Sequence, residues 1–193
     1  LVPGQVETDA SIAKGSPDIK TNVALLRAVR GANPDAFIIY KPHPDVVGGG
    51  RYGALEAEHS DRLFDLQLSD VDISTLLDRV DEVHTLSSLT GFEALLRGCK
   101  VVTYGLPFYA GWGLTEDRCR CPRRNRRLSL EALVAAVLIL YPRYVDPHSG
   151  ELISVEAAMA ILVGQRDSGA QPGWKNRLSG WLYRLFRNVF LRF

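Results

Sequence analysis

Two short polar segments hold the residue types that bind phosphate groups in proteins. The first is Lys41-Pro42-His43-Pro44, which directly follows an apolar run. Because a residue before proline avoids the helical region, the two prolines hold the histidine in an extended backbone. A lysine ammonium and an imidazole at one place suit a phosphate or a carboxylate. The alternative is a rigid turn with a surface histidine, and this segment alone leaves the two interpretations even.

The second segment, residues 85–93, has two serines at the predicted start of a helix. The hydroxyls of Ser87 and Ser88 can cap that helix, or they can join its free backbone N–H groups in holding a phosphate. Glu93 lies one turn further on, where a carboxylate can accept hydrogen bonds from a ribose or complement the helix dipole. Taken together with the first segment, the phosphate interpretation is the better one.

A loop rich in glycine and aromatic residues follows a further apolar run and contains Tyr104, Gly105, Tyr109 and Trp112. Exposed aromatic rings between glycines can form a platform for a base or a sugar ring. The loop can instead pack its own aromatic side chains as a small core, and composition alone slightly favours that alternative.

Two polar residues near the start of the chain, Gln5 and Glu7, are further candidates for facing the ligand cleft. They follow the first apolar run, and the neighbouring Gly4 permits close approach of a ligand. The alternative is an ordinary transition from a strand to a loop.

All of these segments come directly after predicted strands. Apolar runs predict strands at residues 1–6, 36–40, 83–86 and 101–104, and helices are predicted at residues 21–32, 73–80, 89–97, 130–140 and 155–163. The alternation predicts an α/β fold with a Rossmann-like parallel sheet and helices on both of its faces. In such sheets ligands bind beyond the carboxyl ends of the strands, so the candidate residues are expected to meet at one edge.

The composition argues against several classes of protein. The chain has 193 residues, and 23 Lys+Arg against 22 Asp+Glu leave a net charge of +1, which argues against a nucleic-acid partner bound by bulk charge. The 3 Cys do not make a disulfide scaffold. The 4 His offer no pair at the spacing of metal ligands, so a metal is not expected. No cofactor is assigned. No apolar run approaches the roughly 18–20 residues of a spanning helix.

Two segments are strongly basic. Six arginines cluster between residues 118 and 127, either as a solvated loop or as a contact for an anionic acceptor or lipid headgroups. Residues 174–193 carry apolar residues at helical spacing beside five Lys and Arg, which predicts a basic amphipathic helix. This helix is expected to bind an anionic membrane surface or to dock on another domain. The predicted organisation is a Rossmann-like domain at residues 1–165, to which the resemblance described next assigns nucleotide-sugar binding, then a linker at residues 166–173 and this helix.

Four segments, in order, resemble one family of enzymes. They are VPGQVETDASI, IIYKPHPDV, VDEVHTLSSLTGFEALLRGCKVVTYG and PFYAGWGLTED, and the resemblance covers most of residues 1–145. The paired His-Pro and Ser-Ser motifs are similar to those of bacterial glycosyltransferases that use CMP-activated acidic sugars. The longer segments resemble the capsule-polysaccharide β-Kdo transferases of the KpsC type.

This resemblance implies one half of a GT-B-like glycosyltransferase, namely the half that binds CMP-Kdo. It implies that His43, Ser87 and Ser88 bind the CMP phosphate, with Lys41 and Pro42 beside the nucleotide. The chain opens without Met and is interpreted as a piece of a larger protein. The catalytic carboxylate is expected in an N-terminal half that this chain lacks, so no catalytic residue is assigned and the chain is expected to be inactive alone.

The implied reaction is the retaining transfer of Kdo from CMP-Kdo to a lipid-linked Kdo acceptor on phosphatidylglycerol, in capsule biosynthesis and export. The implied partners are that donor, that acceptor, the N-terminal domain of the same protein and an anionic membrane surface. The implied location is cytoplasmic and peripheral at the inner membrane of a Gram-negative cell. Two alternatives stay open: a nucleotide-sugar epimerase or hydrolase of GT-B-like fold, and a non-catalytic membrane-associating module.

Overall fold

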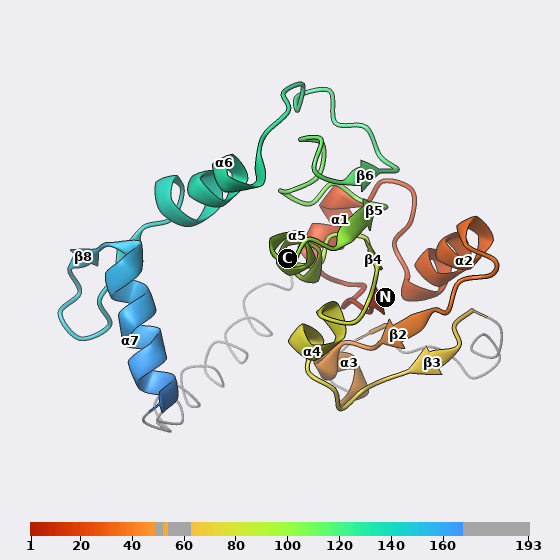
Figure 1. Ribbon diagram of the computed structural model, residues 1–193, viewed down its shortest axis with the longest axis horizontal. Coiled ribbons are helices and arrows are strands. Elements are labelled where there is room, and N and C mark those ends of the chain that lie inside the picture. The colour runs from red at the N-terminus through yellow and green to blue at the C-terminus, as the bar shows by residue number, and fades with distance from the viewer. Residues whose placement is uncertain (49–51, 54–62, 168–193) are drawn as a thin grey trace, which may run out of the picture. The chain divides into compact units, whose positions relative to one another are not determined.

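The structure, a computed structural model, describes residues 1–48, 52–53 and 63–167 (Figure 1). The chain divides into two compact units, Leu1–Val134 and a second unit that begins at Ala135. The predicted helix at residues 174–193 and nearly all of the predicted linker lie outside the described residues. The proposed division at residue 165 therefore stays a prediction.

The first unit is built on parallel strands. One sheet has the order β1 (Val2–Pro3), β2 (Ile39–Lys41) and β3 (Leu66–Gln67), and another has the order β4 (Glu82–Thr85), β5 (Lys100–Thr103) and β6 (Glu116–Asp117). The two sheets meet where the His84 amide donates to the Leu1 carbonyl oxygen at 2.9 Å, beside β1. The strands therefore follow one another in space as β3-β2-β1-β4-β5-β6.

This strand order fixes where a ligand can bind. Along the chain the sheet grows outward in one direction from β1 to β3, and then in the opposite direction from β4 to β6. The connections after β1 and β4 therefore leave on opposite sides and open a crevice at the carboxyl ends of these strands. The order and the crevice are those of a Rossmann-like domain, which confirms the predicted fold class.

Helices cover both faces of this sheet. The helices of the first unit are α1 (Ala10–Gly15), α2 (Asn22–Ala32), α3 (Pro44–Val47), α4 (Ile73–Leu77), α5 (Thr90–Leu96) and α6 (Leu130–Val134). Ile12 of α1 and Leu25 of α2 join Val102 of β5 in one core cluster. The next residue of β5, Val101, is also buried and points to the other face, since strand side chains alternate, and α5 packs against β4 and β5.

Local sequence signals explain several helix ends. Thr21 accepts a hydrogen bond from the Ala24 amide and so caps the start of α2, and Asp72 caps α4 in the same way through Ser74. Gly98 follows α5 with a φ of 77°, the left-handed conformation predicted for this position. Each cap satisfies backbone groups that a helix end leaves without a partner.

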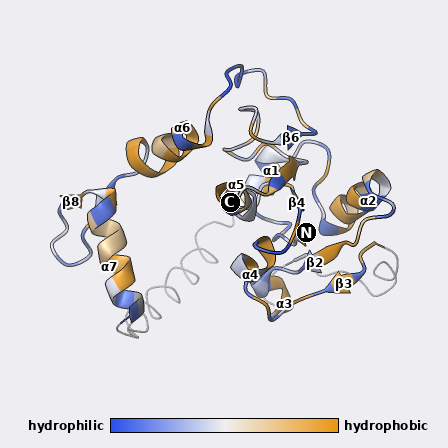
Figure 2. Cartoon of the chain, in the orientation of Figure 1, coloured by the Kyte–Doolittle hydropathy of each residue, from blue (hydrophilic) through white to orange (hydrophobic). Residues whose placement is uncertain are grey.

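The second unit is small and leaves many apolar side chains exposed. A π-helix, η2 (Ala135–Leu140), precedes the antiparallel pair β7 (Tyr144–Val145) and β8 (Leu152–Ile153), and α7 (Val155–Asp167) follows. Figure 2 shows hydrophobic residues along α6 and η2 and, interleaved with polar ones, along α7. Leu140, Tyr141 and Leu162 are among the exposed ones. Within the described part of the chain, no helix is long and apolar enough to cross a membrane.

Some sequence-based boundaries differ from the structure. The strand expected at residues 36–40 is Ile39–Lys41, and Phe37 is 68% exposed. The reason is that the neighbouring strands begin opposite Ile39 and Tyr40, so Phe37 extends past the edge of the sheet. The helix expected at residues 130–140 is α-helical only to Val134 and then continues as η2. The short elements α1, α3, β3, β6, β7 and β8 were not predicted.

Candidate functional site

A cleft of about 670 Å³ opens at the carboxyl ends of β1 and β2. The residues that line it come from the end of β1, the segment after β2, the connection from β3 to α4, and the start of α5. They are Pro3, Gly4, Lys41, Pro42, His43, Pro44, Ser69, Asp70, Val71, Asp72, Ile73, Ser88, Leu89, Thr90 and Glu93. The cleft thus lies at the edge of the sheet where the strand order predicts a ligand site.

Five of the residues predicted to bind a nucleotide donor line this cleft together: Lys41, Pro42, His43, Ser88 and Glu93. The structure brings them together from segments that are far apart in the sequence. The other predicted residues, Ser87, Gln5, Glu7, Tyr104, Gly105, Tyr109 and Trp112, are not among the lining residues.

His43 has a fixed orientation at the entrance to α3. Its backbone is extended, with φ −68° and ψ 136°, as the flanking prolines predict. Its Nδ1 atom accepts a hydrogen bond from the Asp45 amide at 3.2 Å, which caps the helix. This bond assigns the ring proton to Nε2, which can then act as a donor, and His43 is among the residues that line the cleft.

Lys41 supplies a cation to the same cleft. Its Nζ donates to the Ser69 carbonyl oxygen at 3.1 Å, which ties the end of β2 to the connection between β3 and α4. An ammonium group has three donors, so this bond leaves others for a ligand. Asp72, further along that connection, is occupied as a cap, and hydrogen bonds from the Ser74 hydroxyl and amide lower the pKa of its carboxyl.

The two serines play different parts. Ser88 lines the cleft, and its hydroxyl accepts a hydrogen bond from the Thr90 amide at 3.2 Å at the start of α5, whose N-cap residue is Leu89. The Ser87 hydroxyl instead accepts from Gln5 Nε2 at 3.2 Å. A phosphate in the cleft can therefore be reached by Ser88, whereas Ser87 supports the loop.

Gln5 and Glu7 lie behind the cleft rather than on its wall. Gln5 is 7% exposed and its side chain bonds to the segment after β4. Glu7 accepts from the Asn22 amide at 2.7 Å through Oε1, at the start of α2. Both residues therefore connect the loop after β1 to neighbouring segments.

The aromatic loop packs on itself, which is the alternative that composition favoured. Tyr109 is fully buried, its ring packs edge-on against Phe108 at a centroid distance of 5.2 Å, and its hydroxyl donates to the Ser88 carbonyl oxygen. A Cβ atom at Gly91 would lie 2.2 Å from that hydroxyl, so the ring needs a glycine there. The loop thus supports the backbone of Ser88 from behind.

The other residues of this loop are also in structural contacts. The Trp112 indole N–H donates to the Phe108 carbonyl oxygen at 2.7 Å, and the Arg124 guanidinium lies over its ring at 5.6 Å. Tyr104 is buried in the core, and a Cβ atom at Gly105 would lie 2.6 Å from the Leu86 carbonyl oxygen. Glycine at position 105 therefore permits close approach of two backbone segments rather than of a ligand.

The arginine cluster divides into bound and exposed side chains. Arg124 donates to the carbonyl oxygens of Pro107 and Ala110, and Arg118 pairs with Glu116 at 2.7 Å. Arg120, Arg123 and Arg126 are exposed, and no hydrogen bond or ion pair restrains them within the described residues. These three side chains remain available to an anionic partner.

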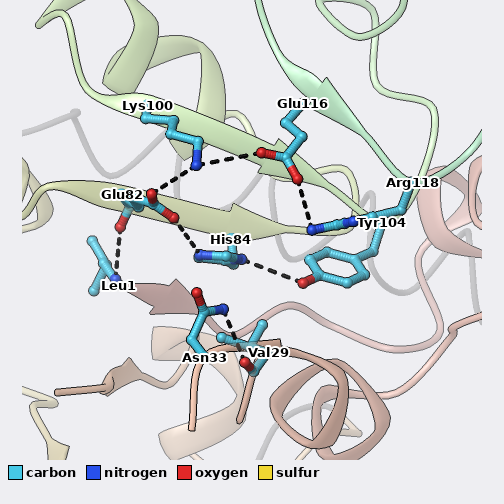
Figure 3. Close-up of polar contacts among 9 residues, drawn as sticks. All are labelled: Leu1, Val29, Asn33, Glu82, His84, Lys100, Tyr104, Glu116 and Arg118. Carbon is cyan, nitrogen blue, oxygen red and sulfur yellow. Dashed lines mark hydrogen bonds and ion pairs between the residues drawn. The ribbon is translucent and has the colours of Figure 1, made fainter. Parts of the chain in front are cut away.

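A charged network that was not predicted from the sequence surrounds a buried histidine (Figure 3). His84 Nε2 lies 3.1 Å from Glu82 Oε2, and Nδ1 lies 3.4 Å from the Tyr104 hydroxyl. Lys100 continues the network to Glu82 at 2.8 Å and to Glu116 at 3.3 Å, so the network ties β4, β5 and β6 together. Burial lowers the pKa of His84. None of these residues lines the cleft, although Glu82 and His84 line a separate pocket beside Leu1.

Residues 69–73 also line the cleft and were not predicted from the sequence. Their signal is weak because β3, which precedes them, is only two residues long. No group of three or more His, Cys, Asp or Glu that could hold a metal ion occurs among the residues that the structure describes.

The chain matches a model of the family described as capsule polysaccharide biosynthesis protein, over residues 1–144. It is 52% identical over 193 residues to the capsule polysaccharide modification protein LipA of Neisseria meningitidis serogroup B, covering 97% of this chain and 27% of LipA. It is 46% identical over 167 residues to the lipopolysaccharide-processing protein LpsZ of Rhizobium meliloti, covering 86% of this chain and 38% of LpsZ.

Two solved structures from Thermosulfurimonas dismutans have the same fold. The KpsC β-Kdo 2,7 transferase has a TM-score of 0.77 and 49% identity, covering 86% of this chain and 52% of that one. The KpsC β-Kdo 2,4 transferase has a TM-score of 0.75 and 37% identity, covering 84% of this chain and 50% of that one. The chain thus spans about half of each transferase and between 27% and 38% of the curated relatives. On this family match and these identities, the chain belongs to the capsule polysaccharide biosynthesis protein family.

Proposed function

We propose that this chain is the donor-binding half of a retaining β-Kdo transferase of capsule biosynthesis and export, with CMP-Kdo as its donor. The observation that supports this most directly is the convergence of Lys41, His43 and Ser88 on one cleft at the reversal of strand order. The acceptor is proposed to be a lipid-linked Kdo on phosphatidylglycerol. The catalytic carboxylate is proposed to lie in another part of the protein.

The proposed chemistry needs positive charge and N–H donors near the leaving phosphate. When the bond between Kdo and CMP breaks, negative charge develops on the phosphate oxygens. Donors already fixed toward that charge lower the barrier without reorganising. His43 Nε2–H is fixed by the bond from the Asp45 amide, and the Lys41 ammonium is held by Ser69. Ser88 can add a hydroxyl donor when its bond to Thr90 Oγ1 is exchanged for one to phosphate.

The sequence identities to the two solved transferases also support a proposal about which Kdo linkage the enzyme forms. Over the matched part, this chain is 49% identical to the β-Kdo 2,7 transferase and 37% identical to the 2,4 transferase. We therefore propose that its module is of the 2,7 type. A transfer assay with the whole protein followed by linkage analysis of the product tests this, and a 2,4 linkage would contradict it.

The nucleotide specificity is tested by calorimetric titration of the chain with CMP, CDP, UMP and UDP. The proposal requires CMP to bind more tightly than UMP and UDP. Tighter binding of a uridine nucleotide would favour a nucleotide-sugar epimerase or hydrolase of the same fold, since a fold does not fix a reaction. Binding of none of them, with strong binding to vesicles, would favour a non-catalytic membrane-associating module.

His43→Ala is expected to weaken CMP binding about 10–100-fold, the range for a lost hydrogen bond to a charged group. Its free energy of unfolding should fall by only about 1 kcal/mol, because the residue is a surface cap. Calorimetry and chemical denaturation measure the two effects. The matched control is His148→Ala, which removes an exposed histidine of the second unit that does not line the cleft. Unchanged CMP affinity in His43→Ala would remove His43 from the site.

We further propose that the protein works at an anionic membrane surface. The exposed Arg120, Arg123 and Arg126 and the basic residues 174–193 support this, because each basic residue near an anionic surface is worth about 1 kcal/mol. Vesicle sedimentation should show binding to phosphatidylglycerol but not to phosphatidylcholine. A chain truncated at Gly173 should bind less, and substituting the three arginines with glutamine should weaken binding further. Equal sedimentation of the intact and truncated chains would contradict a membrane role for residues 174–193 and favour their docking on another domain.

A further inference from the structure

Gln5, a buried side chain near the cleft, makes four side-chain hydrogen bonds to residues that the structure describes. Its Oε1 atom accepts from the Thr85 hydroxyl at 3.1 Å, the Leu86 amide at 3.2 Å and the Ser87 amide at 3.1 Å. Its Nε2 atom donates to the Ser87 hydroxyl at 3.2 Å. One amide group therefore holds the last residue of β4 and the first two residues of the loop that follows it.

The backbone of Gln5 is held just as firmly. Its amide donates to Asn22 Oδ1, and its carbonyl oxygen accepts from Asn22 Nδ2, both at 2.9 Å. Asn22 is 1% exposed, and its own amide donates to Glu7. Its Nδ2 atom also donates to the Gly53 carbonyl oxygen at 3.0 Å. Gln5 is thus anchored to α2 on one side and to the loop after β4 on the other.

The contacts continue from Gln5 to the serine on the cleft wall. The Thr85 hydroxyl donates to Gln5, and its oxygen accepts from the Ser88 amide at 3.2 Å. Gln5 therefore reaches Ser88 through Thr85 and through the backbone of Ser87. Because buried polar groups are costly to leave without a partner, these bonds favour one conformation of the loop.

We propose that Gln5 is a positioning residue, whose amide fixes the loop after β4 so that Ser88 is presented to the phosphate of the nucleotide donor. Gln5 does not touch the donor itself, since it is buried and absent from the cleft wall. The inference rests on the proposed function, because it concerns the same phosphate. It assigns Gln5 a role that acts through Ser88.

The test is a double-substitution cycle of Gln5→Met and Ser88→Ala, read by calorimetry with CMP and with cytidine. Methionine has nearly the same length as glutamine but makes none of its hydrogen bonds. Gln5→Met should weaken CMP binding about tenfold, near the value of a lost charge-assisted bond, and should change cytidine binding by less than about twofold. In a chain that already carries Ser88→Ala, Gln5→Met should have little further effect on CMP binding, because both substitutions remove the same contact between Ser88 and the phosphate.

A general loss of stability is separated from positioning by a matched control. Leu133→Ala removes a buried side chain of α6 that belongs neither to the cleft lining nor to the core cluster that includes Leu86 of the loop. Its unfolding free energy should fall at least as much as that of Gln5→Met, while its CMP affinity at a temperature where it is folded should not change. If Gln5→Met does not fold, Thr85→Val replaces it, because that variant breaks the same path, and Thr85→Ser should restore CMP binding by restoring the hydroxyl.

Three results would overturn the inference. If Gln5→Met or Thr85→Val binds CMP as tightly as the unmodified chain, Gln5 is not needed to position the loop. Equal losses for CMP and cytidine mean that the effect is not on the phosphate. Additive effects of Gln5→Met and Ser88→Ala mean that Gln5 acts independently of Ser88. If the unmodified chain does not bind CMP, the proposed function fails first, and that result is distinct from these three.

Discussion

Tyr109→Ala is expected to lower the free energy of unfolding by about 3–5 kcal/mol, the range for truncating a buried aromatic side chain. The ring is fully buried, packs against Phe92 and Phe108, and lies directly over Gly91. Removing it leaves a cavity that the rigid loop cannot close, and it also frees the Ser88 carbonyl oxygen from its hydroxyl partner. Chemical denaturation, monitored by circular dichroism, measures this change in the free energy of unfolding.

Tyr109→Phe is the control for this prediction. It keeps the ring and removes only the hydroxyl, so it should cost about 1 kcal/mol. If Tyr109 were instead a platform for a base, Tyr109→Ala would weaken CMP binding and leave stability within about 1 kcal/mol, as for a surface residue. That outcome would contradict the packing seen in the structure.

The second large effect concerns the reaction. The chain alone is expected to bind CMP and to transfer no Kdo from CMP-Kdo to a Kdo-terminated acceptor. The physical reason is that His43 and Lys41 can stabilise the leaving phosphate, but the proposed catalytic carboxylate and acceptor site lie elsewhere in the protein. The chain spans 52% of the T. dismutans 2,7 transferase, so that enzyme, assayed alongside, is the positive control.

Mass spectrometry detects the product, and the chain is incubated for much longer than the control enzyme needs to form it. Kdo transfer by this chain at a rate comparable to the control would show that the residues needed for chemistry are all present in it. That result would contradict the division of the enzyme into a donor-binding part and a catalytic part, although it would leave the CMP site intact.

The part of the site that the sequence predicted best is the part with strong local signals. His43 lies between two prolines after an apolar run, and Ser88 precedes a helix with a glycine end signal. Both signals depend on neighbours in the chain, so they can be recognised without the fold. The position of both residues on one cleft then follows from the rule for parallel sheets.

The roles of Gln5 and Tyr109 could not be predicted in the same way. Glutamine and tyrosine bind ligands and also stabilise buried loops, and the residue type does not separate the two uses. What separates them is burial, together with partners such as Ser87 and Gly91, and these contacts form only in the folded chain. The short strand β3 was missed because two residues do not produce a recognisable periodicity.

The pairing of β1 with β4, where the two halves of the sheet meet, has a consequence for how the protein folds. Each half is built from strands that are near one another in sequence, whereas the bonds from Gln5 to Ser87 join residues 82 positions apart. Contacts between distant residues form late, because a long loop must be closed before they can stabilise anything. A nascent chain cannot form the bonds between Gln5 and Ser87 until the segment after β4 has been synthesised. The donor cleft and the centre of the sheet are therefore expected to fold in the same step.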